Sequence, residues 1–380
     1  MSEPVHVLHV VGNMGVGGYE TLIMNIYRNI DRTKVQFDFL IHTENDGEYA
    51  EEIKSLGGRL FHMPVLIQKP KVYYWRLFKY IHALNVFFDS HKEISIVHGH
   101  MTNTASIYMP IASKHHNIKA CISHSHQSEA TPGLQGKVTN ILQKNISKVA
   151  TDYFACSEKA AEWIYPQKII TDGRVNIINN GIDTSRFNYS KDKRHNTRLE
   201  LGIGDKLVIG NVARFKKVKN HKFIIEVFNE VHKLYPNSVL VLVGVGELLS
   251  NIKGQVCNCD LEDSVIFLGG RSDVAELMNA FDIFLLPSLN EGLPLVGIEA
   301  QSTGLPVFTS TGVSRETDVT GNVKFLSLDS SAHQWAEEIL KTYKLYERTD
   351  LSEVIKSKGY DIRSTANWLQ NYYLSKALEK

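Results

Sequence analysis

The sequence has few cysteines and almost no net charge. Its four cysteines, Cys121, Cys156, Cys257 and Cys259, are too few and too scattered for a disulfide framework. The close pair Cys257 and Cys259 has no second pair at metal-binding spacing, so we expect reduced thiols. The formal net charge of +1 argues against a general binder of nucleic acids, because such binding depends on a basic surface.

Long apolar runs are also missing. No unbroken apolar stretch reaches the ~18 residues of a membrane-spanning helix. The first residues show neither the charged segment nor the cleavage site of a secretory signal. We therefore expect a cytoplasmic protein, for which a peripheral contact with the inner face of a membrane stays open.

The sequence does contain an alternation of short apolar runs with helical stretches, which is the pattern of βα units and parallel sheets. In the first half we expect strands at Val5–Val11, Val35–Ile41, Arg59–Met63, Ile94–His98, Ala120–Ser123, Tyr153–Ala155 and Val175–Ile178. In the second half we expect them at Leu207–Asn211, Val239–Val243, Val265–Leu268, Ile283–Leu286, Val307–Thr309 and Val323–Phe325. Between them we expect helices, among others at Glu20–Asn29, His221–Leu234, Val274–Ala280 and Ala332–Tyr343.

A chain of 380 residues exceeds the size at which one hydrophobic core usually stops growing, so two domains are expected. The polar segment Asn179–Phe187, followed by the charged run Lys191–Arg198, has the composition of a linker. The expected fold class is α/β, with two doubly wound domains. Ligands bind beyond the carboxyl ends of the strands in such sheets, so two facing domains would form one cleft. The final stretch, Asn367–Leu378, is expected to be an amphipathic helix.

The most informative segment runs from Pro287 to Ala300. It places Glu291 in a turn and Glu299 eight positions later, about two turns into the helix that should follow. Both carboxylates could then address one ligand. Free N–H groups at the N-terminus of this helix would favour an anion; they belong to Gly292, Leu293, Leu295 and Val296.

Two glycine-containing loops follow strands and have the composition of anion-binding loops. The loop Gly12–Glu20 has four glycines, which would let the backbone approach a ligand closely and adopt positive φ. The loop Val243–Leu249 carries Gly244 and Gly246. Neither loop has the third glycine of the dinucleotide-binding pattern, and a tight turn between strand and helix is the alternative for both.

The segment Asn211–Asn220 places four cations after a strand and directly before a helix. Among them, Arg214 offers a planar pair of donors and Lys219 a compact charge, a combination suited to a diphosphate. A solvated basic turn is the alternative, but the position at the carboxyl end of a strand favours ligand binding.

Two pairs of histidines, His98 with His100 and His124 with His126, end apolar strands, where they would lie on the rim of the cleft. A histidine there could bond a sugar hydroxyl or a phosphate, or move a proton. The spacing is no zinc signature, so no metal is expected, and a structural role is the alternative for each histidine.

The segment Lys69–Tyr80 mixes basic and aromatic residues and leads into Ile81–Phe88. Such a helix could lie on an anionic membrane surface, with its aromatic rings at the headgroup level. The alternative is a helix packed on its own sheet.

Together these segments resemble the retaining glycosyltransferases of family GT4, in particular those of bacterial capsule and exopolysaccharide synthesis. The family has the GT-B fold, in which two Rossmann-like domains face each other across a cleft. The resemblance covers nearly the whole chain and is most specific in the second half, where four segments match family motifs: Gly210–Asn220, Leu242–Glu247, Gly269–Leu286 and Glu291–Glu299. In the first half, Gly15–Glu20 resembles the family's G-G-x-E loop.

The resemblance implies an acceptor-binding domain at 1–183, a donor-binding domain at 184–361 and a last helix, about 362–380, that packs back on the first domain. It implies that Glu299 bonds the ribose, that Glu291 lies by the donor sugar and that Arg214 and Lys219 neutralise the diphosphate. Further donor-side residues that it implies are Gly17, Gly18, Gly244, Gly246, Arg271 and the amides of Gly292, Leu293, Leu295 and Val296. On the acceptor side it implies Gly15, His100 and His126, with His124 at the reacting sugar.

The reaction implied is the transfer of a sugar, with retention, from a nucleotide-diphosphate sugar to a glycan acceptor. We expect a UDP-sugar donor and an acceptor linked to a polyprenyl diphosphate. Cleavage leaves a cationic sugar and an anionic leaving group, and preorganised cations and amides stabilise the latter. No metal cofactor is expected, since the D-x-D motif is missing. A nucleotide-sugar 2-epimerase of the same architecture and a non-catalytic sugar-nucleotide-binding partner are the alternatives.

Overall fold

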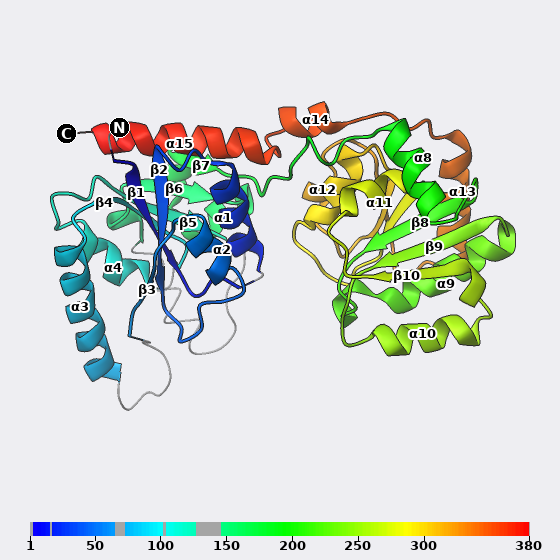
Figure 1. The fold of residues 1–380 in the computed structure, drawn as a ribbon, viewed down its shortest axis with the longest axis horizontal. Helices are drawn as coiled ribbons and strands as arrows, with labels where there is room; N and C mark the ends of the chain where they lie inside the picture. The colour runs from blue at the N-terminus through cyan, green and yellow to red at the C-terminus, as the bar shows by residue number, and fades with distance from the viewer. Residues whose placement is uncertain (1–2, 16, 65–72, 102–103, 127–145, 380) are drawn as a thin grey trace. The chain divides into compact units, whose positions relative to one another are not determined.

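The computed structural model describes residues 3–15, 17–64, 73–101, 104–126 and 146–379 (Figure 1). The chain divides into two compact units. Unit 1 comprises residues 1–181 and 362–380, and unit 2 comprises residues 182–361. Each unit contains one parallel sheet covered by helices on both faces, which confirms the predicted α/β class with two doubly wound domains.

The sheet of unit 1 has seven strands in the order β3-β2-β1-β4-β5-β6-β7, and all neighbours pair in parallel. The strands are β1 (Val5–Val11), β2 (Val35–Ile41), β3 (Leu60–His62), β4 (Ile94–Gly99), β5 (Ala120–Ser125), β6 (Asp152–Ala155) and β7 (Val175–Ile177). Successive side chains of a strand point to opposite faces. In β1, Val7 and Val11 therefore pack into one layer of the core, and Leu8 and Val10 into the other.

Helices cover both faces of this sheet. On the face of Val7 lie α1 (Gly18–Asn29), α2 (Ala50–Ser55) and α15 (Ile362–Leu378). On the opposite face lie α3 (Tyr73–Ser90), α4 (Ala105–Ala112), α6 (Glu158–Ile164) and α7 (Gln167–Thr171). The last helix, α15, thus belongs to unit 1 although the chain reaches it only after passing through unit 2, and it lies beside α1, β1 and β4 (Figure 1).

The sheet of unit 2 has six parallel strands in the order β10-β9-β8-β11-β12-β13. They are β8 (Leu207–Val212), β9 (Ser238–Val243), β10 (Val265–Gly269), β11 (Ile283–Leu286), β12 (Val307–Ser310) and β13 (Val323–Leu326). One face carries α9 (His221–Leu234), α10 (Leu249–Asn258) and α13 (Ala332–Leu345), and the other carries α11 (Val274–Ala280), α12 (Leu295–Ser302) and α14 (Ser352–Ser357). Each strand predicted from the apolar runs is present in the two sheets.

One segment predicted to be a linker is a helix, α8 (Lys191–Glu200). The Ser190 hydroxyl accepts an N–H of its first turn at 3.3 Å. Arg194 and Arg198, four residues apart on one side of the helix, donate to carbonyls at the C-terminal end of α11 and to Asp282. The linker prediction was wrong because composition shows that the helix is charged but not which partners its charged side contacts.

The aromatic part of the basic–aromatic segment lies in α3, while Lys69–Val72 lies outside the described residues. Tyr80 is buried and its hydroxyl hydrogen-bonds Nε2 of His42 at 2.7 Å, so this side of α3 packs on its own sheet. Trp75 and Phe78 are 71% and 67% exposed, so the other side presents two large aromatic rings to solvent. No helix among the described residues has both the length and the hydropathy to cross a membrane.

Candidate active site

In unit 2, the loops that follow β8 and β11 are bonded to each other. The two strands are neighbours in the sheet, so their carboxyl ends lie side by side. The Leu289 N–H donates to the Val218 carbonyl at 2.8 Å, and the Asn220 amide donates to the Pro287 carbonyl at 3.2 Å. The predicted cation segment and the predicted carboxylate segment therefore form one surface.

Lys219 and Glu291 form an ion pair on this surface. Lys219 ends a 3-10 turn, and its Nζ donates to Oε2 of Glu291. The Glu291 backbone is fixed by two hydrogen bonds, from its N–H to the Gly312 carbonyl at 3.1 Å and from the Ser314 N–H to its carbonyl at 3.0 Å. The two side chains are only 21% and 15% exposed. Little water therefore competes with the ion pair, which holds both charges in place.

Polar groups without partners lie on the same segments. Among the described residues, Oε1 of Glu291, Oγ of Ser288, Oδ1 of Asn211 and both ring nitrogens of His221 are buried without a hydrogen bond. His221 begins α9, and burial together with the charge of Lys219 lowers its pKa to about 4. Buried polar groups are nearly always paired in folded proteins. Several unpaired groups at one edge of a sheet are therefore typical of a site that a polar ligand completes.

The two predicted arginines of unit 2 differ in their partners. The Arg214 side chain is exposed, and within the described part of the chain it has no hydrogen-bond or ion-pair partner. Arg271 instead pairs with Asp273 and, at 3.4 Å, with Glu200. The charge of Arg214 is thus free to meet an anion, whereas that of Arg271 is already balanced by two carboxylates.

Helix α12 begins later than predicted, at Leu295, so that Glu299 lies one turn into it and not two. Gly292 and Leu293 belong to the preceding turn, while the N–H groups of Leu295 and Val296 are in the first turn, where no intrahelical acceptor exists. Burial raises the pKa of Glu299 from 4.5 to about 7, and the charge of Arg186 opposes this rise. The carboxyl group therefore changes its charge near neutral pH.

Gly244 and Gly246 are required by the packing of the neighbouring loop. Both have positive φ, and a Cβ on them would lie 2.0 Å from the Ala213 carbonyl oxygen and 2.6 Å from the Phe215 backbone, respectively. The Phe215 N–H donates to the Val245 carbonyl at 2.9 Å, which ties the two loops together. Glycine here lets the loop after β9 support the cation segment that carries Arg214.

In unit 1, the glycine-rich loop leads directly into α1, with Gly17 as its N-cap at φ −123°. Val16 lies outside the described residues. The predicted positive φ is wrong for the glycines of this loop that the structure describes, because extended and helical values suffice for a direct entry into the helix. At Gly18 no atom lies within 4 Å of the position that a Cβ would take, so the backbone is open there.

Five histidines lie on one face of the three neighbouring strands β1, β4 and β5, and this face is covered by α1 and α15; they are His9, His98, His100, His124 and His126. His100 and His126 follow the last residues of β4 and β5, so they lie at the carboxyl ends as predicted. His98 and His124 lie inside these strands, and His98, His100 and His124 are all buried. The prediction of a position on the rim is therefore wrong for these three, because helices pack over this face.

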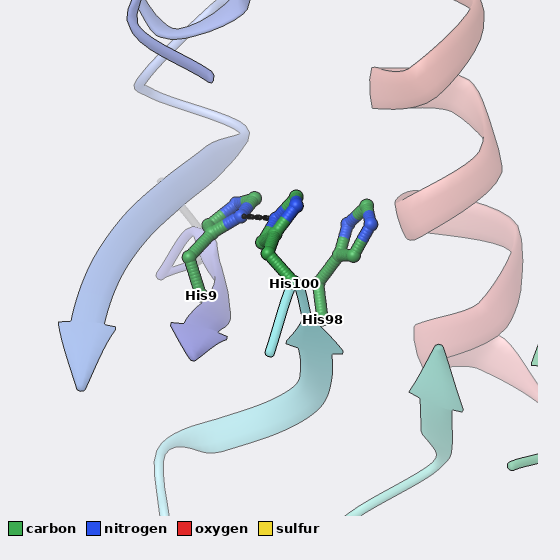
Figure 2. A group of neighbouring side chains, drawn as sticks. All are labelled: His9, His98 and His100. Carbon is green, nitrogen blue, oxygen red and sulfur yellow. Dashed lines mark hydrogen bonds between the residues drawn. The ribbon is translucent and has the colours of Figure 1, made fainter. Parts of the chain in front are cut away.

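The five rings form two chains of hydrogen bonds. In one chain, Nδ1 of His100 bonds Nε2 of His126 at 2.8 Å. Nε2 of His100 also bonds Nδ1 of His9 at 3.0 Å, as the dashed line in Figure 2 shows. In the other, Nε2 of His98 bonds Nδ1 of His124 at 3.1 Å. Burial lowers the pKa of all five rings, so they are neutral at physiological pH.

Two groups of three histidines bring ring nitrogens within 4.8 Å of one another, His9 with His98 and His100, and His100 with His124 and His126. Among the described residues, these are the side chains that could hold a metal ion. However, the ring planes of the first group lie only 17–28° apart, and Figure 2 shows the rings in a row. Lone pairs lie in the ring plane, so nearly parallel rings do not direct three nitrogens to one point. In each group one pair of rings is instead joined by a hydrogen bond, His9 with His100 in the first and His100 with His126 in the second.

Three aromatic or histidine residues beside the unit 1 histidines were not predicted from the sequence as site residues, and neither was His221 in unit 2. Tyr19 stacks on His100 and His126, with ring centroids 5.9 and 5.2 Å apart, and so connects the glycine-rich loop to the histidines. Its position beside Gly18 was an available signal. His9 and Tyr373 gave none, because only the order of the strands and the return of α15 bring them to the other histidines.

Comparison with known proteins identifies the family. Residues 193–361 match the family "Glycosyl transferases group 1", and residues 16–186 match "Glycosyltransferase Family 4". The chain is 34% identical over 379 residues to the putative glycosyltransferase EpsF of Bacillus subtilis, covering 98% of this chain and 97% of that protein. The chain belongs to the family 4 glycosyltransferases.

Two further relatives of this glycosyltransferase carry informative names. An Escherichia coli enzyme named UDP-Gal:alpha-D-GlcNAc-diphosphoundecaprenol alpha-1,3-galactosyltransferase is 29% identical over 58% of each chain. The capsular polysaccharide biosynthesis glycosyltransferase CapH of Staphylococcus aureus is 22% identical over 98% of this chain and all of its own. Among solved structures, Anabaena HepE in complex with UDP has a TM-score of 0.73 at 17% identity, covering 98% of this chain and 100% of that one. The fold of this glycosyltransferase is GT-B.

Proposed function

We propose that this glycosyltransferase moves a sugar, with retention of configuration, from a UDP-sugar to a lipid-linked glycan during the assembly of a bacterial capsule or exopolysaccharide. The Escherichia coli relative is named for a UDP-sugar donor and a diphosphoundecaprenol-linked acceptor, and HepE was crystallised with UDP. CapH is named for capsular polysaccharide. These names support the donor, the acceptor and the process. We place the reaction at the cytoplasmic face of a membrane.

The observation that carries the proposal is the group of cations and unpaired polar atoms at the carboxyl edge of the unit 2 sheet. When the bond to the anomeric carbon breaks, negative charge develops on the diphosphate. Lys219 is already held in place by Glu291, and Arg214 is exposed and has no partner among the described residues. Fixed positive charges where negative charge develops usually accelerate a reaction more than any other single effect in an active site.

We assign the following roles to these residues. Arg214, Lys219 and the amides of Leu295 and Val296 bind the diphosphate, with the turn at Gly292 and Leu293 beside them. Glu291 bonds hydroxyls of the donor sugar, and its unpaired Oε1 is the acceptor for them. Glu299 bonds the ribose, so Glu299→Ala raises the donor KM. Unchanged affinity for UDP in calorimetry would contradict this role.

Gly17 and the open backbone at Gly18 line the donor side of unit 1. On the acceptor side, Gly15, His100 and His126 belong to one proposed surface, where the exposed part of the Tyr19–His126 stack suits a sugar substrate. No metal takes part in the proposed reaction, because two cationic side chains supply the positive charge. Full activity after treatment with EDTA would support this point, and activity restored only by a divalent ion would contradict it.

A panel of UDP-sugars tests the proposal. The true donor raises the melting temperature by mass action, and labelled sugar is then transferred to a diphosphoundecaprenol-linked acceptor. The anomeric signals of donor and product in NMR spectra show whether configuration is retained. A donor that becomes epimerised without any acceptor would assign the chain to the epimerase reaction instead, and UDP binding without transfer to any acceptor would leave only a binding role.

A further inference from the structure

A chain of two hydrogen bonds connects α15 to His124. The hydroxyl of Tyr373 bonds Nδ1 of His98 at 2.6 Å, and Nε2 of His98 bonds Nδ1 of His124 at 3.1 Å. All three side chains are buried. The remaining nitrogen of His124, Nε2, has no partner among the described residues.

Each of these groups carries one proton. Burial and the neighbouring imidazoles lower the pKa of His98 and His124 well below 6.5, so both rings are neutral and each has a single N–H. Burial raises the pKa of Tyr373 well above 10, so its hydroxyl keeps its proton. Only two arrangements of the three protons then satisfy both hydrogen bonds.

In the first arrangement Tyr373 donates to His98, His98 donates to His124, and the proton of His124 is on Nε2. This leaves one group unpaired, the Nε2–H. In the second arrangement both bonds are reversed, and His124 carries its proton on Nδ1. That leaves two groups unpaired, the Tyr373 O–H and the Nε2 lone pair, since the Tyr373 oxygen has no second partner in the described part of the chain. One more unpaired buried group disfavours the second arrangement roughly tenfold or more.

We propose that Tyr373 is a positioning residue that acts through His98 to keep the proton of His124 on Nε2. Nε2 of His124 is then a hydrogen-bond donor and cannot accept a proton as a general base. That a sugar oxygen of the substrate reaches this buried nitrogen rests on the proposed function. The proton arrangement itself does not, because it follows from the hydrogen bonds of unit 1.

Replacement of Tyr373 by phenylalanine removes the preference. Without the hydroxyl, both arrangements leave two groups unpaired, so neither is favoured. The fraction of His124 with a proton on Nε2 is then expected to fall to about half, and kcat/KM to fall about twofold through this population alone.

Long-range ¹H–¹⁵N NMR of protein labelled at histidine nitrogens measures the tautomer directly. His124 is assigned by the signals that disappear in His124→Gln. In the wild-type protein we expect a protonated Nε2 and an unprotonated Nδ1, and in Tyr373→Phe both signals should move toward intermediate shifts. Tyr372→Phe is the matched control, because this neighbour on α15 donates its hydroxyl to Asp152 and to no histidine.

A His124 signal with the proton on Nδ1 in the wild-type protein would overturn the proposal. An unchanged tautomer in Tyr373→Phe would overturn it equally. If Tyr373→Phe does not fold, the wild-type spectrum alone decides. Because the spectra need no substrate, the absence of any transfer activity would refute the proposed function and leave this result standing.

Discussion

Replacement of Lys219 by alanine is expected to reduce kcat/KM for the donor sugar about a hundredfold, the scale of one preorganised charge. The structure adds a second effect. Oε1 of Glu291 is already buried without a partner, and loss of the lysine leaves Oε2 unpaired as well. A buried acceptor without a partner costs about 1–3 kcal/mol, so the free energy of unfolding should fall by this order.

Arg214→Ala separates the two effects. Arg214 is exposed and unpaired within the described residues, so its loss should reduce donor turnover about as strongly and leave stability within about 0.5 kcal/mol of the wild type. Lys217→Ala is the control for a cation on the same 3-10 turn, because its side chain is exposed and it is expected to change neither property.

The assay is the initial rate of transfer over a range of donor concentrations, with urea unfolding of the same preparations. The double variant with Lys219→Ala and Glu291→Ala should recover part of the lost stability but none of the activity. Near-normal turnover in both Lys219→Ala and Arg214→Ala would refute the assignment of the diphosphate site. Full stability of Lys219→Ala would show that the ion pair does not hold Glu291.

Three further predictions concern other parts of the molecule. Because burial raises the pKa of Glu299 from 4.5 to about 7, the wild-type protein should lose stability relative to Glu299→Gln as the pH rises from 4.5 through 7. A difference in urea midpoint between the two proteins that is the same at pH 4 and pH 8 would contradict this. Gly246→Ala should lower the free energy of unfolding by about 1–3 kcal/mol because its Cβ meets the Phe215 backbone, whereas Gly270→Ala, with only an ordinary contact at 3.7 Å, should not. Because Trp75 and Phe78 are exposed, the wild-type protein should co-sediment with anionic vesicles at low salt. Changing both residues to serine should weaken this binding, and a wild-type protein that stays in the supernatant would contradict a membrane role.

The sheets could be predicted from the sequence because their strands are buried on both faces. A parallel strand covered by helices on each side reads as a continuous apolar run, such as Val239–Val243 or Ile283–Leu286, and these runs mark the strands directly. The helix α8 could not be predicted in this way. It is stabilised by hydrogen bonds from Arg194 and Arg198 to carbonyls at the C-terminal end of α11. Such contacts leave no periodic apolar pattern in the sequence.

The candidate site was predictable in its parts and not in its connections. Lys219 and Glu291 were both predicted because each follows a strand of one parallel sheet, but nothing in the chain shows that they pair across 72 positions. The bond between His98 and Tyr373 spans 275 positions and depends on the return of α15. Gly244 and Gly246 show what the composition of a loop cannot decide. Their backbone supports a neighbouring loop, and a glycine motif looks the same whether it serves this purpose or binds a ligand.

The return of α15 to unit 1 also has a consequence for biosynthesis. The residues of unit 2 are continuous in the chain, so they have all been translated before α15 is made, whereas unit 1 lacks one covering helix until Ile362–Leu378 leaves the ribosome. Domains fold as units during synthesis, so unit 2 can complete its core first. Until α15 docks, the layer around Val7 and Phe37 and the histidines beside it stay open to water and to chaperones. The nascent protein is therefore most vulnerable to aggregation on the face that later holds the histidine chains.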